Sequence, residues 1–122
     1  MKTFALKIAG LSIAMTALML TPAYAELRAA SGKVTFLRVH DVGTRYGPPS
    51  DQLDVEVVIQ LSSAPGQAFG FQLRNDANRP VRQGMLDLLR DAYANNSTVI
   101  VDFNIDPPKK NGVIIRVALT KP

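Results

Sequence analysis

The chain has 122 residues, with 14 lysines and arginines, 10 aspartates and glutamates, one histidine and no cysteine. This length suits one domain, and without cysteine its stability must come from packing or from subunit contacts. The net charge of +4 is far from the strongly basic balance of a nucleic-acid-binding domain, so we expect no nucleic-acid partner.

Residues 1–25 have the three-part layout of a secretory signal peptide. Two lysines give a positive start, an apolar run follows over 8–20, and the segment ends in Ala-Tyr-Ala. The run is shorter than the roughly 20 residues of a membrane span. We expect cleavage between Ala25 and Glu26. One domain over 26–122 would then be secreted or periplasmic, with no membrane span, and its net charge would fall to +2 when two lysines are removed.

The first predicted strand covers residues 33–40, after a short polar lead-in over 26–31. Its residues are mostly β-branched or aromatic, a composition that favours strands. Simple alternation places Val34, Phe36 and Arg38 together on one side of this strand.

Two further strands follow, at 53–61 and 68–74. The first of them alternates with period two, the clearest strand pattern in the chain, with Glu56 on the outer face. The side chains expected to face inward are Leu53, Val55, Val57, Ile59, Leu61, Phe69, Phe71 and Leu73. Gly70 predicts either a bulge or a close approach of two backbones.

The spacing of apolar residues then changes and predicts an amphipathic helix over 79–94. Asn78 is expected to cap its start, Pro80 suits its first turn, and Asn95 or Asn96 can end it in the left-handed conformation. The predicted apolar stripe consists of Val81, Met85, Leu88, Leu89 and Ala92.

The last two predicted strands cover 98–105 and 113–119. Their expected inward residues are Val99, Val101, Phe103, Ile105, Val113, Ile115, Val117 and Leu119. The order of three strands, one helix and two strands lacks the alternation of a doubly wound parallel sheet. It fits the OB-fold, a mainly β, five-stranded Greek-key barrel, with the helix between strands three and four. An open α+β sheet with the helix on one face is the alternative.

Catalytic and metal chemistry find little support in the residues. His40 is the only histidine, no cysteine is present, and no serine stands in a nucleophile-elbow motif. Zinc sites need paired histidine or cysteine ligands, and the 106–112 turn lacks the carboxylates of a calcium loop. We therefore expect a protein that is not an enzyme and needs no cofactor or metal.

The connection at 40–52 is longer than the 2–5 residues common in hairpin loops, which favours a functional role. Its Arg45 and Tyr46 suit a sugar, an anion or a protein interface. In an OB-fold this loop and the loop between strands four and five border the usual ligand groove. The predicted ligand-binding residues are Arg45, Tyr46, Asp51, Gln72, Arg74, Lys109 and Lys110. An insertion without a ligand, or an oligomer contact, remains the competing interpretation of the loop.

The segment GMLDLLRDAYANNSTVIVDFNI resembles the OB-fold B subunits of pentameric bacterial toxins of the subtilase cytotoxin and typhoid toxin type. The shared pattern is a helix with a Leu-Leu pair followed by Ala and Tyr, then a polar turn and a strand. Here these positions are Leu88, Leu89, Ala92 and Tyr93. The resemblance implies a secreted OB-fold that forms a ring and binds glycans. Those subunits carry a disulfide, which this chain cannot form.

The leading hypothesis is an exported, non-enzymatic binding module, a homo-oligomer that recognises a glycan or another small anionic ligand. The alternative is a protein-interaction or structural OB-fold protein of the bacterial envelope with an exported partner. Single-stranded nucleic-acid binding is the least favoured, because such sites need stacking aromatics in a basic groove and only Tyr46 is suitably placed.

Overall fold

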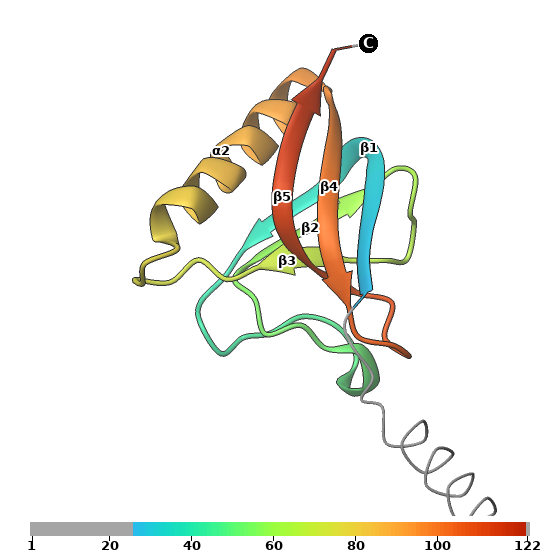
Figure 1. Ribbon diagram of the computed structural model, residues 1–122, viewed down its shortest axis with the longest axis vertical. Helices are drawn as coiled ribbons and strands as arrows, with labels where there is room; N and C mark the ends of the chain where they lie inside the picture. The colour runs from blue at the N-terminus through green and yellow to red at the C-terminus, as the bar shows by residue number, and fades with distance from the viewer. Residues whose placement is uncertain (1–25, 122) are drawn as a thin grey trace, which may run out of the picture.

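The computed structural model describes residues 26–121, and the predicted signal peptide lies outside the described residues. The strands close into a barrel in the order β1-β2-β3-β5-β4 (Figure 1). The elements are β1 (Glu26–Val39), a 3-10 turn η1 (Pro49–Asp51), β2 (Val57–Leu61), β3 (Phe69–Phe71), α2 (Arg79–Asn95), β4 (Thr98–Ile105) and β5 (Gly112–Thr120). This order, with the helix between β3 and β4, confirms the predicted OB-fold-like barrel and excludes the open sheet. None of the helices in the described part has the length and apolarity needed to span a bilayer.

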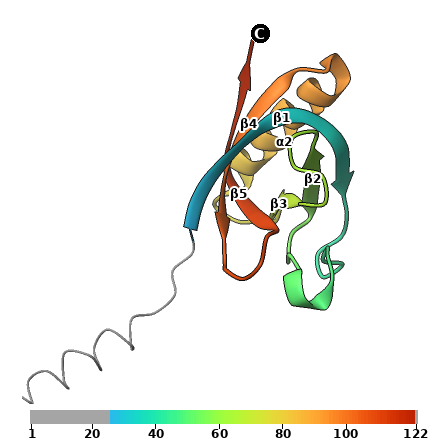
Figure 2. The same ribbon diagram turned by 90° about the vertical axis from the view of Figure 1, so that its right-hand side faces the viewer.

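Strand β1 is longer than predicted and curves over the barrel (Figure 2). Residues 26–33 pair with β4, whereas residues 34–39 pair with β2. The expected polar lead-in is therefore wrong: its side chains are mostly exposed, but its backbone hydrogen-bonds to β4. A bulge between Val34 and Phe36 also moves these two side chains to opposite faces, so Val34 is in the core and Phe36 is outside.

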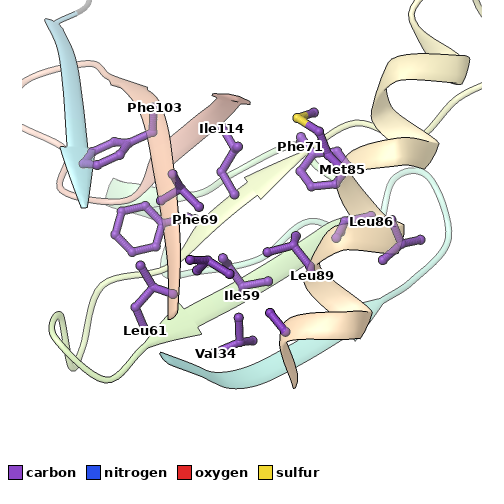
Figure 3. Close-up of a cluster of buried hydrophobic side chains, with 14 of the residues drawn as sticks. Val34, Ile59, Leu61, Phe69, Phe71, Met85, Leu86, Leu89, Phe103 and Ile114 are labelled. Atoms are coloured by element: carbon purple, nitrogen blue, oxygen red, sulfur yellow. The ribbon is translucent and has the colours of Figure 1, made fainter. Parts of the chain in front are cut away.

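The core lies between the barrel strands and α2, which packs across the opening of the barrel (Figure 3). Phe69 and Phe103 meet edge to face with ring centroids 4.7 Å apart. The predicted inward residues of β4 are all buried, which confirms the period-two assignment there.

The helix covers the predicted range, but its buried face is rotated. The buried residues are Met85, Leu86, Leu89 and Ala92. Leu88 is half-buried, and Val81 is 68% exposed, so the predicted stripe was partly wrong. Asn96 has the expected left-handed conformation, with φ of 54°. Asn78 precedes the helix without a side-chain capping bond, and its own N–H instead donates to the Asp76 carboxylate at 2.9 Å.

A second bulge reverses the predicted faces in the first part of β5. Asp102 lies opposite Arg116, but the next residue of β4 lies opposite Ile114, so Ile115 has no partner. Ile114 is consequently buried, whereas Val113, Ile115 and Leu119 are about two-fifths exposed at 41%, 40% and 39%. The prediction that Val113 and Ile115 face inward is wrong, because one inserted residue inverts the alternation at this point. Leu119 keeps the register of Val117, opposite the buried Val99, and is exposed near the end of the strand. Val117 still packs against the core.

Candidate binding surface on the first loop

The first loop, residues 40–56, folds back over the outer face of the barrel. A second hydrophobic cluster forms beneath it from Leu53, Val55, Val58 and Ala68, with Phe36 and Tyr46 packed against it. Val57 and Ile59, the residues on either side of Val58 in β2, belong to the main core. This second cluster is therefore on the opposite face of the strand. Leu53 and Val55 were predicted to face the barrel interior and instead attach the loop to its outside. The length of the loop therefore has a structural purpose.

Tyr46 is held in place at the centre of this loop. Its backbone N–H donates to the carbonyl of Leu53 at 3.0 Å, and Leu53 returns a bond at 2.8 Å. Its ring lies 6.1 Å from that of Phe36, and its hydroxyl accepts a long bond of 3.4 Å from Gln60 Nε2. The guanidinium carbon of Arg38 lies 6.0 Å from the ring centroid, at the limit of a cation–π contact. Tyr46 is thus half-buried and fixed, and does not project freely as expected.

Two arginines beside Tyr46 carry uncompensated charge. Arg38 and Arg45 are exposed, and neither has a carboxylate within salt-bridge distance among residues 26–121. Arg45 adopts a positive φ of 62°, and its Nη1 lies 3.4 Å from Gln52 Oε1. We name the group formed by Arg38, Arg45, Tyr46, Gln52 and Gln60 the Arg–Tyr surface. Sequence reasoning missed Arg38 because the bulge beside it was not foreseen.

Asp51 joins the first loop to the loop between β4 and β5. It is 7% exposed, and its carboxylate accepts the backbone N–H of Asn111 at 3.1 and 3.3 Å. Asn111 Nδ2 donates to the Asp51 carbonyl at 2.9 Å, and Asn111 Oδ1 accepts from the N–H of Ala68 at 2.9 Å. A Cβ at position 47 would lie only 2.6 Å from the Asp51 carbonyl oxygen, so glycine fits here and a larger residue does not. The predicted ligand residue Asp51 is therefore occupied by internal hydrogen bonds.

An ion pair holds the base of the loop. Glu56, predicted to face outward, is 3% exposed and receives two bonds from Arg74, at 2.8 and 2.9 Å. Its Oε1 also accepts the N–H of Leu73 at 3.1 Å, while Arg74 reaches Asp54 at 3.0 Å. The hydrogen bond with Glu56 and the attraction of both carboxylates raise the pKa of Arg74. Gln72 donates to the Asp54 carbonyl at 3.1 Å. Gln72 and Arg74 are thus both donors in the hydrogen-bond network at the base of the loop.

The two predicted lysines lie on the loop between β4 and β5. Lys109 and Lys110 are exposed, and no carboxylate pairs with them in the part of the chain that the structure describes. The loop is attached on one side through Asn111 and on the other by Gln67, whose side chain donates to the Lys110 carbonyl at 2.5 Å. Among the predicted site residues, the exposed cations Arg45, Lys109 and Lys110 are therefore distinct from Asp51, Gln72 and Arg74, which are buried or half-buried and bond within the loops.

His40 is the remaining titratable side chain that the sequence analysis weighed as a catalytic candidate. His40 Nε2 lies 2.7 Å from the carbonyl oxygen of Val55, which places the ring at the base of the first loop. Within residues 26–121, no three histidine, aspartate or glutamate side chains gather as metal ligands.

No protein-family model matches the chain, and no curated protein matches its sequence. Among solved structures, the barrel is similar to a chain in the crystal structure of human heat-labile enterotoxin in complex with a blood group A antigen analog. The match has a TM-score of 0.55 and 18% sequence identity, and it covers 80% of this chain and 89% of that chain. At this identity the likeness shows the fold. The chain therefore has an OB-fold-like barrel similar to that of the enterotoxin chain, which is the fold that its sequence predicted.

Proposed function

We propose that this chain is an exported, non-enzymatic binding module that recognises an acidic glycan or a similar small anion through the Arg–Tyr surface. The observation that carries this proposal is a pair of uncompensated arginines around a fixed Tyr46: the Arg38 guanidinium lies 6.0 Å from its ring centroid, and Arg45 precedes it in the chain. An exposed cation without a partner contributes little to folding, so its charge remains available to a ligand.

The chemistry of the surface suits a hydroxylated acid. A guanidinium binds a carboxylate, phosphate or sulfate through two parallel hydrogen bonds. The tyrosine adds an apolar ring edge and a hydroxyl, and the amides of Gln52 and Gln60 donate and accept in turn. Because the bridge to Leu53 already fixes Tyr46, binding would cost little loop ordering.

We assign ligand contact to Arg38, Arg45, Tyr46, Lys109 and Lys110. Asp51, Gln72 and Arg74 are given a positioning role instead, because their side chains bond within the two loops. The enterotoxin structure with a blood group A antigen analog supports a glycan as the ligand class, by analogy of fold.

Replacing Arg38 and Arg45 together with glutamine is expected to weaken ligand binding by roughly a hundredfold, since each lost charged hydrogen bond costs about 1.5–3 kcal/mol. Melting should hardly change, because substitutions of exposed side chains stay within about 0.5 kcal/mol. The measurement is a glycan array with acidic and neutral members, followed by titration of the best ligand. Arg79→Gln with Arg90→Gln on α2 is the matched control. The proposal fails if no glycan or anion binds, or if both double variants bind equally well.

We further propose that the protein assembles with copies of itself through the face formed by α2 and β5. A groove of about 600 Å³ runs between these elements and continues into a smaller hollow of about 240 Å³. Its apolar lining consists of Val81, Met85, Leu88, Val113, Ile115, Val117 and Ala118. Strand β5 pairs with β3 only through Gly112 and Val113. Most of the β5 edge that faces β3 is therefore not used in pairing with β3 and is available for other contacts. An exposed apolar patch of this kind marks an interface.

Replacing Ile115 with lysine is expected to raise the dissociation constant of the assembly by at least about a hundredfold, because a buried unpaired charge costs several kcal/mol. Analytical ultracentrifugation over a range of concentrations measures this. Leu27→Lys, at another exposed apolar position, should leave assembly unchanged. A parent protein that is monomeric at every concentration contradicts self-assembly. The groove would then favour the alternative function, a protein-interaction module of the bacterial envelope, for which a pull-down from periplasmic extract is the test.

A further inference from the structure

A small polar pocket lies where the C-terminal end of α2 meets β1, β4 and β5. It has a volume of about 220 Å³ and is lined by the helix end at 95–96 together with Lys33, Ser97, Thr98, Thr120 and Lys121. Strand β4 starts at this pocket and ends at the loop that bears Lys109 and Lys110. The pocket shares no residue with the Arg–Tyr surface, so the two are treated as separate sites.

The register of the barrel aligns three of the lining side chains. Lys33 lies directly opposite Thr98, and Thr98 lies directly opposite Thr120. Residues that oppose each other in antiparallel strands project to the same face of a sheet. One ammonium group and two hydroxyl groups thus stand in a row across three strands, and the helix end closes the row on one side.

The pocket carries two positive charges without a counter-ion among residues 26–121. It is lined by two lysines and no carboxylate, and neither lysine has an acidic partner within salt-bridge distance among residues 26–121. The helix end itself carries partial negative charge from its carbonyl oxygens, which would repel an anion. Two carbonyl oxygens at this helix end already accept hydrogen bonds: Ala92 accepts from the N–H of Ser97 at 3.0 Å, and Asn96 accepts from the Lys33 ammonium.

Several donors in the pocket are still free. An ammonium group has three N–H donors, so Lys33 retains two after binding Asn96. The hydroxyls of Ser97 and Thr98 make no hydrogen bond to the described residues. We infer that this lysine pocket binds a small oxyanion, which is a carboxylate, phosphate or sulfate group. The ligand would be held by Lys33 and Lys121 together with the hydroxyls of Ser97 and Thr98. This inference does not depend on the proposed function of the first loop.

A titration of the ¹⁵N-labelled protein tests the inference by NMR. Inorganic phosphate, sulfate and acetate are added separately at constant ionic strength, with sodium chloride as the balancing salt. At least one of the three anions should produce saturable shifts of the amide signals of Lys33, Ser97, Thr98 and Thr120. The arm with the tightest binding identifies the oxyanion. The absence of a saturable shift with all three anions overturns the inference.

Charge-removing variants decide whether the pocket is responsible. Lys33→Gln with Lys121→Gln should weaken the anion affinity by at least about tenfold, since charged hydrogen bonds are lost. Lys121→Gln by itself leaves the bond between Lys33 and Asn96 in place, and it should weaken binding without changing the melting temperature. Arg79→Gln with Arg90→Gln on α2 removes two exposed charges outside both proposed sites, and this matched control should bind the anion as the parent does. Equal binding by the pocket variants and the parent, or equal loss in the control, refutes the site. The Arg38 and Arg45 variant should retain the shifts, which separates this test from that of the first loop.

Discussion

Replacing Leu89 with alanine should lower the free energy of unfolding by about 2–5 kcal/mol, the range for a buried leucine truncated to alanine. Leu89 is 0% exposed and lies in the main core, where α2 packs across the opening of the barrel. Its removal would leave a cavity between the helix and the strands, because neither can shift far without losing its other contacts. Equilibrium unfolding in urea, followed by circular dichroism, measures the loss.

Asp91→Ala is the matched control on the same helix, outside the groove between α2 and β5. Asp91 is exposed, so its truncation should change the free energy of unfolding by no more than about 0.5 kcal/mol. Similar effects of the two substitutions would mean that α2 does not pack against the barrel as described.

Replacing Gly70 with alanine should destabilise the protein by at least about 3 kcal/mol, at or above the upper end of the range for overpacked sites. A Cβ at this position would lie 2.6 Å from the carbonyl oxygen of Val57 and 2.6 Å from a methyl group of Val55. The first of these atoms belongs to the backbone of the paired strand β2, which cannot move aside as a side chain can. Sequence analysis predicted a close backbone approach or a bulge at Gly70, and the structure shows the close approach.

Gly84→Ala provides a control of opposite sign. A Cβ at Gly84 would meet no atom within 4 Å, and the residue lies inside α2. Alanine should therefore stabilise the protein by about 0.5–1 kcal/mol, since it favours the helix and restricts the unfolded chain. Thermal melting of both variants measures the contrast. Destabilisation of equal size at the two glycines would contradict the packing described around Gly70.

The first loop combines two roles that the sequence could not separate. Its apolar residues Leu53 and Val55 attach it to the outer face of β2, while Arg45 remains exposed. A loop held in this way presents its cations in a fixed geometry. The structural role explains the length of the loop, and the uncompensated arginines support the proposed binding role.

Local periodicity predicted a large part of the fold. The helix was expected over 79–94 and spans Arg79–Asn95, and every predicted inward residue of β4 is buried. These assignments succeed because the period of 3.6 or 2 residues appears within a single element. They fail at the bulges near Thr35 and Ile115, where one additional residue inverts the faces and leaves no mark on composition.

The sequence by itself determined the order of elements and the exposed Arg45 of the first loop, and it predicts an export signal. Only the tertiary structure decided which polar residues are supports. Asp51 and Asn111 are 60 positions apart, and Glu56 and Arg74 are 18 positions apart, yet each pair is hydrogen-bonded. Likewise, Arg38 on β1 lies beside the ring of Tyr46, which belongs to the first loop. Contacts of this kind depend on the closure of the barrel, which brings distant segments together and leaves no periodic pattern in the chain.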